Sequence, residues 1–492
     1  MTRDKSTTQI GDEFRDTLAS LLGAAGFRAT AEVLADYKKA DLALTYLRDD
    51  VDGVSRYLVE AKSYTNAVPQ DECTKFVSAY KPLVDDGTYD RAWLVSRGPI
   101  STTGRRAIER HRNLRCFTYQ ELQRSLLNFD DYLRDLIRRY DSEKIASYYI
   151  PPTSSDGEDL NEYMDKWIEE ENSNPVAIVA GYGRGKTTFA LHFSACRAQK
   201  ALDNPNSRIP ILIPLGDTID DITLESLIGK MFSSQFRLNN YHFSLFTALN
   251  NAGKFVILFD GFDEMKHGMS IGMFDRAVQQ LTRLDAGDGK LLFLGRDTAF
   301  HSDEEFRFVI QGRQTTSLGR VAPRISRRPF TEKGIRELTE EEVERYVRGY
   351  FPLRLKELHI NADNDWISKR INELLSDDLK ELINRPVHAK MLCEIATSRN
   401  YRISVTSSLD LYDRFVTSVL ERETSKRMRD PDFGIRVRRE FNARVAWRRH
   451  FGRRVRVRPC GHSSLPPAPA GRSTSATSGT FPRSQRPTGS AR

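Results

Sequence analysis

The chain has 492 residues, of which 39% are hydrophobic and 29% are charged, and its formal net charge is +8. This composition is ordinary for a globular protein, and the length is too great for a single core, so we expect about three domains. No apolar run approaches the ~18 residues of a membrane span, and the start, MTRDKSTTQIGDEF, lacks a secretory core. These features argue against a membrane or secreted protein and predict a cytoplasmic one.

The positive charge is concentrated near the C-terminal end. Residues 441–492 contain eleven arginines and no lysine, aspartate or glutamate, which leaves −3 (+8 minus 11) for the rest of the chain. A nucleic-acid-binding surface in the folded part must therefore be a local patch. The five cysteines lie far apart and form no CxxC pair, which argues against a disulfide framework and a zinc site.

Residues 1–128 are expected to form a compact α/β domain. In GDEFRDTLASLLGAAGF, apolar residues recur at helical spacing and Gly26 offers a stop. The strand-like segments ADLALTYL and YLVEAKSY follow, joined by the polar turn RDDVDGVS. A helix over about 70–85, the strand RAWLVS and a helix from about Thr102 complete the pattern.

Two opposite charges share one face of the strand in RYLVEAKSY. Side chains alternate along a strand, so Leu58, Glu60 and Lys62 point the same way. Asp41 lies in the preceding strand, and a hairpin or adjacent strands would bring it beside Glu60 and Lys62. Glu13, in the first helix, is a possible fourth member. Metal-dependent cleavage of a phosphodiester needs such carboxylates to converge on Mg²⁺, with a cation near the water or the scissile phosphate.

Residues 129–172 are mostly charged and are expected to be a helical linker, broken at SYYIPPTSSDGED. In residues 173–329 the apolar runs PVAIVAG, IPILIPL, KFVILFDG and KLLFLGR alternate with helical stretches. Strands that are apolar on both faces and alternate with helices predict a doubly wound parallel sheet.

The segment AGYGRGKTT, residues 180–188, follows one of these strands and precedes a helix. A glycine-rich loop in this place lets backbone N–H groups wrap the phosphates of a nucleotide. Lys186 would reach the β- and γ-phosphates and Thr187 would hold Mg²⁺. The strict pattern GxxxxGK[ST] has glycine where this chain has Ala180. The predicted nucleotide-binding residues of the loop are Gly181, Gly183, Arg184, Gly185, Lys186, Thr187 and Thr188.

Acidic residues end the strand in KFVILFDGFDEM. Asp260, followed by Asp263, sits where ligands bind in doubly wound sheets and is predicted to hold the Mg²⁺ shell. Glu264 would orient or deprotonate the attacking water. Arg296, which ends KLLFLGR, is suited to sensing the γ-phosphate and fits a surface salt bridge equally well.

From about residue 330 to 430 the pattern is helical, and Thr339 with Glu342 forms a capping box. Residues 431–492 are rich in Pro, Ser, Gly and Arg and are expected to be disordered. Lysine disappears after Lys426 while arginine continues, as expected of a GC-rich gene read out of frame. A genuine basic tail that binds nucleic acid is the alternative. No internal repeat of about 20 to 50 residues is evident.

The series AGYGRGKTT, IPILIPL, ILFDGFDEM, LLFLGRD, RPFTEKGIRELTEEEVERYVRGYF and NRPVHAKML resembles the NACHT class of STAND NTPases, over residues 170 to about 425. The resemblance implies an ATP-binding switch in which ADP is held in a closed monomer and ATP permits oligomerisation. It implies a helical and winged-helix region over 330–430 and places Pro386 near the adenine, although the residue fits a helix N1 proline equally well. The chain has no NKxD motif, which is consistent with ATP rather than GTP.

Glu13, Asp41 and Glu60-Ala61-Lys62, with the elements around them, resemble the PD-(D/E)xK restriction-endonuclease fold, particularly its Mrr-like members, over residues 9 to about 125. The resemblance implies Mg²⁺-dependent cleavage of DNA, with Asp41 and Glu60 as metal ligands. Asp41 follows alanine rather than proline, which leaves the metal chemistry unaffected. A degenerate but folded nuclease domain is the alternative.

A nuclease joined to a NACHT-type switch resembles bacterial antiphage STAND systems, in which a sensor recognises an invader and ATP-driven assembly clusters the nucleases. We therefore expect a DNA substrate, ATP and Mg²⁺ as cofactors, an invader-derived trigger, a homo-oligomer on activation and no membrane association. An out-of-frame terminus would make the chain a fragment without its sensor. One alternative is an NTP-dependent restriction or repair nuclease that moves on DNA. Another is a signalling scaffold whose first domain only binds DNA or a protein.

Overall fold

The computed structural model describes residues 6–47, 53–215, 223–236, 238, 241–267, 271–296, 313–315, 321–323, 328–398, 407–426, 440 and 443–444. The chain divides into two compact units, residues 1–418 and 419–492, and the elements below belong to the first, except that the last helix runs past its end. The expected disorder and the reading frame of residues 431–492 concern a segment that lies almost wholly outside the described residues.

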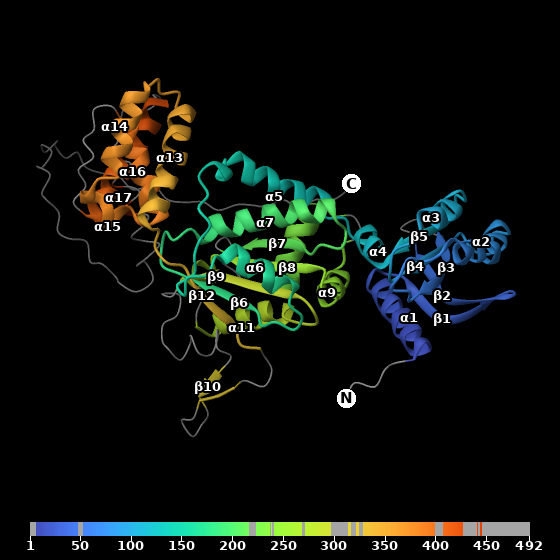
Figure 1. Ribbon diagram of the computed structural model, residues 1–492. Helices are drawn as coiled ribbons and strands as arrows, with labels where there is room; N and C mark the ends of the chain where they lie inside the picture. The colour runs from blue at the N-terminus through green and yellow to red at the C-terminus, as the bar shows by residue number, and fades with distance from the viewer. Residues whose placement is uncertain are drawn as a thin grey trace, which may run out of the picture. The chain divides into compact units, whose positions relative to one another are not determined.

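The N-terminal domain is built on a five-stranded mixed sheet with the order β1-β2-β3-β4-β5 (Figure 1). Strands β1 to β3 form an antiparallel meander, and β3, β4 and β5 are parallel. The strands are β1 (Arg28–Ala35), β2 (Lys38–Leu47), β3 (Val54–Lys62), β4 (Arg91–Ser96) and β5 (Leu114–Thr118).

Helices cover both faces of this first sheet. The helices are α1 (Thr7–Ala24), α2 (Gln70–Asp85), α3 (Thr102–Glu109) and α4 (Tyr119–Leu126). One face packs Leu42 and Val59 against Leu18 of α1, and the other packs Leu58 against Phe76 of α2. The alternation along β3 therefore places Glu60 and Lys62 on one face, as predicted, and this face is the one that α2 covers.

The sequence pattern anticipated most of this domain and missed three elements. The helices α1 to α3 and the strands β2 to β4 lie where they were expected, and Gly26 follows α1 with a φ of 90°, a conformation that favours glycine. The edge strand β1 was missed because most of its side chains are exposed, so it shows no apolar alternation. Strand β5 and helix α4 fell inside a stretch expected to be a single helix.

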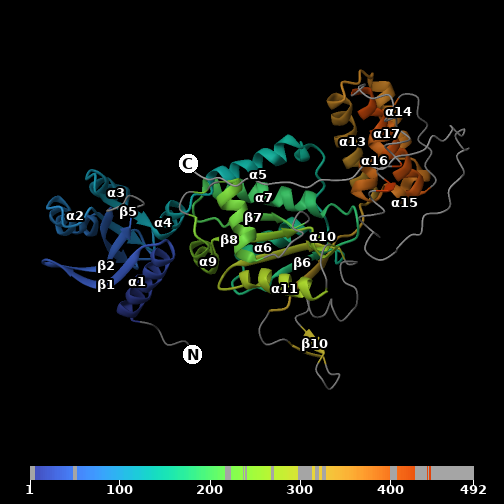
Figure 2. The ribbon, with the colours of Figure 1, turned by 180° about the vertical axis from the view of Figure 1, so that it is seen from behind.

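The second sheet has five parallel strands in the order β12-β6-β9-β8-β7. They are β6 (Val176–Val179), β7 (Ile209–Pro214), β8 (Phe255–Asp260), β9 (Lys290–Gly295) and β12 (Thr331–Gly334). Helices α5 and α7 lie on one side of the sheet and α11 on the other (Figures 1 and 2). The predicted doubly wound parallel sheet is confirmed. Strand β12, a polar edge strand in the stretch expected to be helical, extends the sheet past residue 329.

The helices around the second sheet are α5 (Asp130–Ser142), η1 (Ile145–Ser147), α6 (Leu160–Glu169), α7 (Lys186–Asp203), α8 (Leu224–Gly229), η2 (Lys230–Gln235), α9 (Phe243–Asn251), α10 (Phe262–His267), α11 (Ile271–Leu281) and η3 (Thr282–Leu284). The first three lie in the expected linker, residues 129–172. Leu133 of α5 and Trp167 of α6 are buried in the same core as the sheet. This stretch is helical as expected, and it packs as part of the core.

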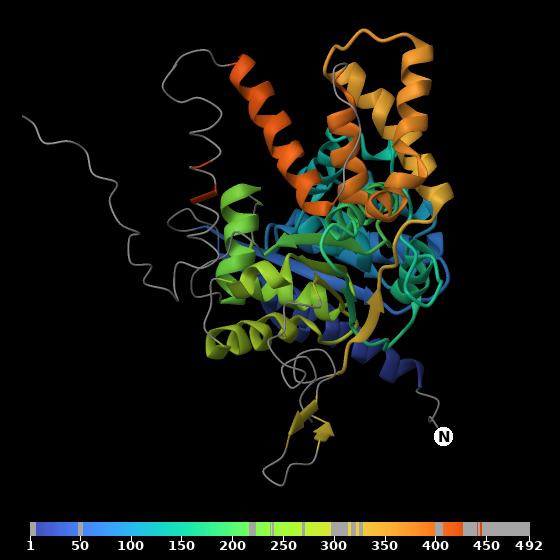
Figure 3. The same ribbon diagram turned by 90° about the vertical axis from the view of Figure 1, so that its left-hand side faces the viewer.

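The last described region is helical (Figure 3). It comprises α13 (Glu340–Glu357), α14 (Asn364–Leu374), η5 (Asp377–Leu379), α15 (Lys380–Ile383), α16 (Pro386–Ala396) and α17 (Ser408–Lys426). The capping box of Thr339 and Glu342 at the start of α13 is confirmed. In the described part of residues 330–430, the only strand is β12. The strands that would form the wing of the expected winged-helix region are not seen among these residues.

Smaller features complete the description. Strands β10 (Arg313–Thr315) and β11 (Val321–Pro323) form a separate antiparallel pair. Cys73, Cys116, Cys196 and Cys393 are free thiols, as expected. Across the described ranges we find no helix with the length and apolarity to cross a bilayer.

Candidate functional site

Asp41 and Glu60 lie side by side on neighbouring antiparallel strands. The register of β2 and β3 sets Leu42 opposite Val59, and Asp41 and Glu60 are the next residues along these strands. The backbone N–H of Ala61 donates to Asp41 Oδ2 at 2.7 Å, which fixes the carboxylate beside the end of β3. The hairpin expected from the sequence therefore brings these two acids together.

Glu60 is surrounded by groups that hold its carboxylate. Lys62 Nζ lies 3.1 Å from Glu60 Oε1, and Lys38 Nζ lies 3.5 Å from Glu60 Oε2. The hydroxyl of Tyr80, which is fully buried in α2, donates to the same Oε2. The Glu60 side chain is only 12% exposed, so these contacts replace much of its hydration.

Lys62 is held between two carboxylates. Its Nζ lies 3.1 Å from Glu60 and 3.3 Å from Oε2 of Glu72, a residue in the first turn of α2. Sequence reasoning missed Glu72, Tyr80 and Lys38. The spacing of Glu72, Phe76 and Tyr80 by four residues was the available signal, because it puts all three on the side of α2 that faces the sheet.

The crowding of charges shifts two pKa values. Burial raises the pKa of Asp41; the Ala61 hydrogen bond opposes this, and the neighbouring Glu60 charge adds to it. For Lys62, burial lowers the pKa, but the ion pairs with Glu60 and Glu72 outweigh burial and raise it. Lys62 is therefore a cation throughout the neutral range, whereas the Asp41 carboxyl holds its proton more tightly than an exposed aspartate does.

Glu13 lies on a different element from Asp41, Glu60 and Lys62. It lies on α1, the helix that packs on the face of the sheet opposite to α2, and its side chain is exposed. The contacts that surround Asp41, Glu60 and Lys62 are made by Ala61, Lys38, Glu72 and Tyr80. The role of Glu13 as a fourth member stays a prediction.

The glycine-rich loop connects β6 to α7, as the sequence predicted. Gly183 and Gly185 have φ values of 74° and 90°, in the left-handed region that other residues rarely adopt. Lys186, the first residue of α7, turns its Nζ back onto the loop and donates to the carbonyl oxygens of Ala180, at 2.6 Å, and Gly181, at 3.1 Å. The Lys186 ammonium group therefore lies against the glycine-rich loop in which the phosphates would bind.

Asp260 ends β8 and reaches the start of α7. The Thr187 hydroxyl donates a hydrogen bond to its carboxylate. Burial raises the pKa of Asp260, this hydrogen bond lowers it, and the charge of Glu264 raises it. Glu264 is exposed and lines the same pocket. Hydroxyl and carboxylate therefore meet where the sequence placed the Mg²⁺ of a bound nucleotide.

Asp263 and Arg296 contact each other. Asp263 is 3% exposed, and its carboxylate accepts from the backbone N–H of Arg296 at 3.2 Å and lies 2.9 Å from Arg296 Nε. The guanidinium also lies over the ring of Tyr182 in the glycine-rich loop, 4.9 Å from its centroid. Asp263 thus positions Arg296 at the edge of the pocket, and sensing of a γ-phosphate by Arg296 stays a prediction.

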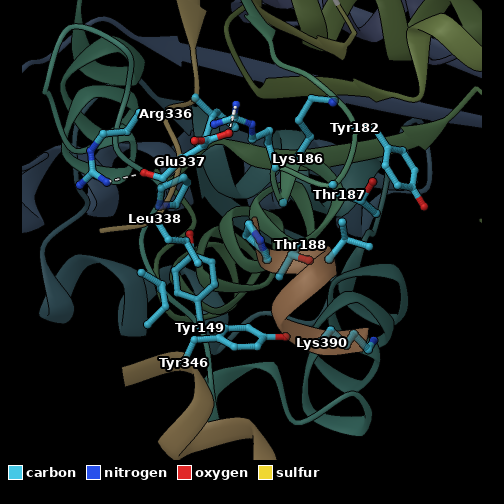
Figure 4. Close-up of a pocket in the computed structure, with 18 of the residues that line it drawn as sticks. Tyr149, Tyr182, Lys186, Thr187, Thr188, Arg336, Glu337, Leu338, Tyr346 and Lys390 are labelled. Carbon is cyan, nitrogen blue, oxygen red and sulfur yellow. Dashed lines mark hydrogen bonds and ion pairs between the residues drawn. The ribbon is translucent and has the colours of Figure 1, made fainter. Parts of the chain in front are cut away.

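A cavity of about 340 Å³ lies against the glycine-rich loop. Thr187, Thr188 and Lys186 border it together with Tyr149, Leu338 and Tyr346, as Figure 4 shows. The wall formed by residues 148–153 was not predicted, because that stretch had the composition of a linker. This segment contacts the core at the end of β12 and at α7: the backbone N–H of Arg336 donates to the Thr153 carbonyl oxygen at 3.1 Å, and the ring of Tyr149 stacks on His192.

The start of α16 closes the cavity at the glycine-rich loop. Pro386 is the first residue of α16, as the helix N1 interpretation had it, and it also lines the cavity, with its Cγ 3.8 Å from where a Cβ of Gly185 would be. Arg184 Nη2 lies 2.8 Å from Glu337 Oε1, and Arg385 Nε lies 3.2 Å from the same oxygen. Ion pairs through Glu337, as well as packing, therefore connect the start of the helical region to the glycine-rich loop.

Both places suit a divalent cation of the Mg²⁺ type. Such an ion is commonly held by one or two carboxylates, with water and substrate phosphate oxygens filling its shell. Asp41 and Glu60 provide two carboxylates, and Thr187 with Asp260 provides a hydroxyl and a carboxylate. In the described residues no three His, Cys, Asp or Glu side chains are grouped as a metal site. A metal at either place would thus complete its shell with water and the substrate.

Comparison with known proteins gives the N-terminal domain a family. Residues 8–126 match the family described as restriction endonuclease. The chain is 26% identical over 273 residues to an uncharacterized WD repeat-containing protein of Nostoc sp., covering 50% of this chain and 18% of that protein. The chain thus spans less than a fifth of that relative.

Two solved structures share a low overall similarity with the chain. A Walker-type ATPase of Pyrococcus abyssi has a TM-score of 0.32 and 14% identity, covering 60% of this chain and 79% of that one. The Orc1 protein of Aeropyrum pernix, solved in complex with DNA, has the same TM-score and identity, with coverages of 54% and 66%. The part of the chain that carries the second sheet and the glycine-rich loop is called the P-loop body below. Its fold is assigned from the order of its parallel strands and from that loop, and the two solved structures carry no part of the assignment. The chain therefore joins a restriction-endonuclease-like domain to a body with the parallel sheet and glycine-rich loop of a P-loop ATPase.

Proposed function

We propose that this protein is an ATP-regulated nuclease in which the N-terminal domain hydrolyses DNA phosphodiester bonds with Mg²⁺ and the P-loop body controls when it does so. The observation that carries the proposal is the meeting of Asp41, Glu60 and Lys62 at the ends of β2 and β3 in a domain that matches the restriction endonuclease family. Two acids and a retained cation at one point are what phosphodiester hydrolysis with a metal requires.

The chain's own groups divide the work as follows. Asp41, fixed by the Ala61 N–H, and Glu60, fixed by Tyr80 and Lys38, would hold the metal. Lys62 would place positive charge against the scissile phosphate, and its raised pKa keeps it protonated at neutral pH. Mg²⁺ bound there would supply an activated water and neutralise charge on the phosphate.

The nucleotide site supports the regulatory half of the proposal. Lys186, Thr187 and Asp260 would hold Mg-ATP in the cavity, Glu264 would polarise the water, and Arg296 would face the γ-phosphate. The start of α16 rests on the loop that would take the phosphates, so the nucleotide state would bias the packing of the helical region against the core.

The biological setting is proposed from the NACHT resemblance. We infer a STAND-type antiphage role, in which an invader-derived trigger and ATP drive assembly of a homo-oligomer that pairs nuclease domains on DNA. The Nostoc relative is WD repeat-containing by name and far longer, which supports the idea that sequences of this kind operate beside a repeat domain that would read the trigger.

The test is a plasmid-nicking assay with Mg²⁺, with and without ATP, on the full chain. Lys62→Ala should reduce nicking by about 100-fold or more, because one stabilising charge is lost from the transition state. Lys81→Ala is the matched control, since Lys81 lies on α2, is 44% exposed and pairs only with Asp85 among described residues. Equal nicking by wild type and Lys62→Ala would refute the nuclease assignment.

The nucleotide arm uses a second pair of variants. Lys186→Ala should abolish ATP binding and the effect of ATP on nicking, and should leave nuclease-domain stability unchanged. Lys200→Ala, near the other end of α7 and 54% exposed, should behave as wild type. Binding would be followed as the ATP-dependent rise in Tm, because a ligand at about 100 times its Kd stabilises by about 2.7 kcal/mol. An equal rise in Lys186→Ala would refute the site.

A further inference from the structure

Arg97 begins the turn that follows β4, at the end of the sheet that carries the candidate nuclease site. The register of the parallel strands sets Lys62 opposite Ser96. The backbone N–H of Arg97 then donates to the carbonyl oxygen of Lys62 at 2.9 Å. Strands β3 and β4 are neighbours throughout (Figure 1), so the register of their residues places Arg97 at the same end of the sheet as Glu60 and Lys62.

The turn that carries Arg97 is packed tightly against the segment after β3. A Cβ added at Gly98 would lie 2.6 to 2.9 Å from the carbonyl oxygens of residues 64–66, which is too close for any other residue. The N–H of Val68 donates to the Pro99 carbonyl at 2.8 Å, and the N–H of Ser101 donates to the Val68 carbonyl at 3.1 Å. The backbone of Arg97 is therefore held in place.

The Arg97 side chain is exposed, and it makes no hydrogen bond or ion pair with any residue that the structure describes. Other cations of this domain differ: Lys38 and Lys62 are paired with Glu60, and Arg105 with Glu121. An exposed, unpaired guanidinium on a fixed backbone at the same end of the sheet as Glu60 and Lys62 is suited to contact a phosphate of the substrate, because a guanidinium binds phosphate oxygens through two parallel N–H donors.

We propose that Arg97 contacts a backbone phosphate of the DNA substrate next to the scissile one and so positions the strand over Asp41, Glu60 and Lys62. This inference rests on the proposed nuclease function and adds a residue that binds substrate without carrying out the chemistry. Contacts to phosphates set the register of a protein on DNA and do not depend on the base sequence.

The test compares Arg97→Ala and Arg97→Lys with Arg112→Ala in the full chain. Arg112 is also exposed and unpaired among described residues, but it lies at the opposite end of β4, where the Asn113 carbonyl accepts from the N–H of Ala92 at 3.1 Å. Affinity for a fluorescein-labelled DNA duplex would be measured by anisotropy over a series of salt concentrations, with Ca²⁺ in place of Mg²⁺.

Arg97→Ala should weaken binding by about tenfold, as expected for loss of one charged hydrogen-bonding group. It should also reduce the slope of log K against log salt by about 0.9, whereas Arg112→Ala should change neither quantity. Arg97→Lys should keep the slope and lose part of the affinity, because it keeps the charge and loses the paired donors. That rescue separates a phosphate contact from a folding defect.

The outcomes distinguish this inference from the proposed function. If wild type binds the duplex and the Arg97 variants lose affinity, but no nicking occurs with Mg²⁺, the phosphate contact holds and the nuclease assignment fails. If wild type nicks DNA and Arg97→Ala binds with unchanged affinity and salt slope, the inference is overturned. Failure of wild type to bind the duplex at all overturns it as well.

Discussion

The backbone N–H of Val387 donates to the carbonyl oxygen of Gly183 at 3.2 Å, so the first turn of α16 rests directly on the glycine-rich loop. A Cβ built at Gly183 would lie 2.0 Å from Val387 Cγ1, and Gly183 has a φ of 74°. Gly183 and Val387 are more than 200 positions apart in the chain, and they pack so closely that a side chain at position 183 would overlap Val387. A rearrangement of the loop around phosphates would have to move α16.

Gly183→Ala is predicted to destabilise this body in the absence of nucleotide. The left-handed backbone alone costs about 1–2 kcal/mol for a residue with a Cβ, and the overlap with Val387 adds to that. Gly181→Ala is the control, because Gly181 has no left-handed φ and its Cβ would meet no described atom within 4 Å. It should change the free energy of unfolding by about 0.5 kcal/mol or less. Denaturant unfolding without ATP measures both.

The double variant Gly183→Ala with Val387→Gly tests the cause. Removing the Val387 side chain relieves the overlap but not the backbone cost, so the loss in the double variant should be smaller than the sum of the two single losses. Additive losses would show that the contact between α16 and the loop is not what restricts residue 183.

Asp41→Asn is predicted to stabilise the metal-free N-terminal domain at neutral pH. Burial and Glu60 raise the pKa of Asp41 in the folded chain above its ordinary value. The folded state then holds its proton more tightly than the unfolded state, so its stability falls as pH rises through the window between these two pKa values and stays lower above it. Asparagine removes the charge and keeps an oxygen to accept from Ala61.

Melting curves in EDTA would compare wild type and Asp41→Asn across pH. The variant should have the higher Tm at pH 7, and the difference should shrink at pH values below the ordinary pKa of aspartate. Mg²⁺ should raise the Tm of wild type and not of the variant. A variant that melts lower than wild type at pH 7 would contradict the raised pKa of Asp41.

Much of both sites was predictable because it depends on rules that act over short distances in the chain. The alternation of side chains places Glu60 and Lys62 together, and a hairpin brings back Asp41. A glycine-rich loop between a buried strand and a helix identifies Lys186 and Thr187 in the same way. In each case the strand or helix determines the direction of the side chain.

The parts that could not be predicted come from packing between distant segments. Glu72 and Tyr80 reach the nuclease site only because α2 folds back over β3. Tyr149 borders the nucleotide cavity because Thr153 and Ser154 attach this segment to residues just after β12, a strand too polar to be recognised. The sequence left Arg296 open between a γ-phosphate contact and a surface salt bridge, and only the tertiary structure shows that Asp263 is its ion-pair partner.

Glu72→Gln is predicted to slow nicking by about tenfold with little change in the apparent affinity for DNA, as is typical when a residue that orients a catalytic group is lost. Burial lowers the pKa of Lys62, and the Glu60 and Glu72 carboxylates raise it, so removing one carboxylate must lower that pKa. The alkaline limb of the pH–rate profile should therefore move to lower pH.

Asp71→Asn is the control, since Asp71 is exposed in the same first turn of α2 and has the same relation to the helix dipole. If both variants shifted the limb equally, a general change in charge at the helix start would account for the effect, and the contact between Glu72 and Lys62 would not.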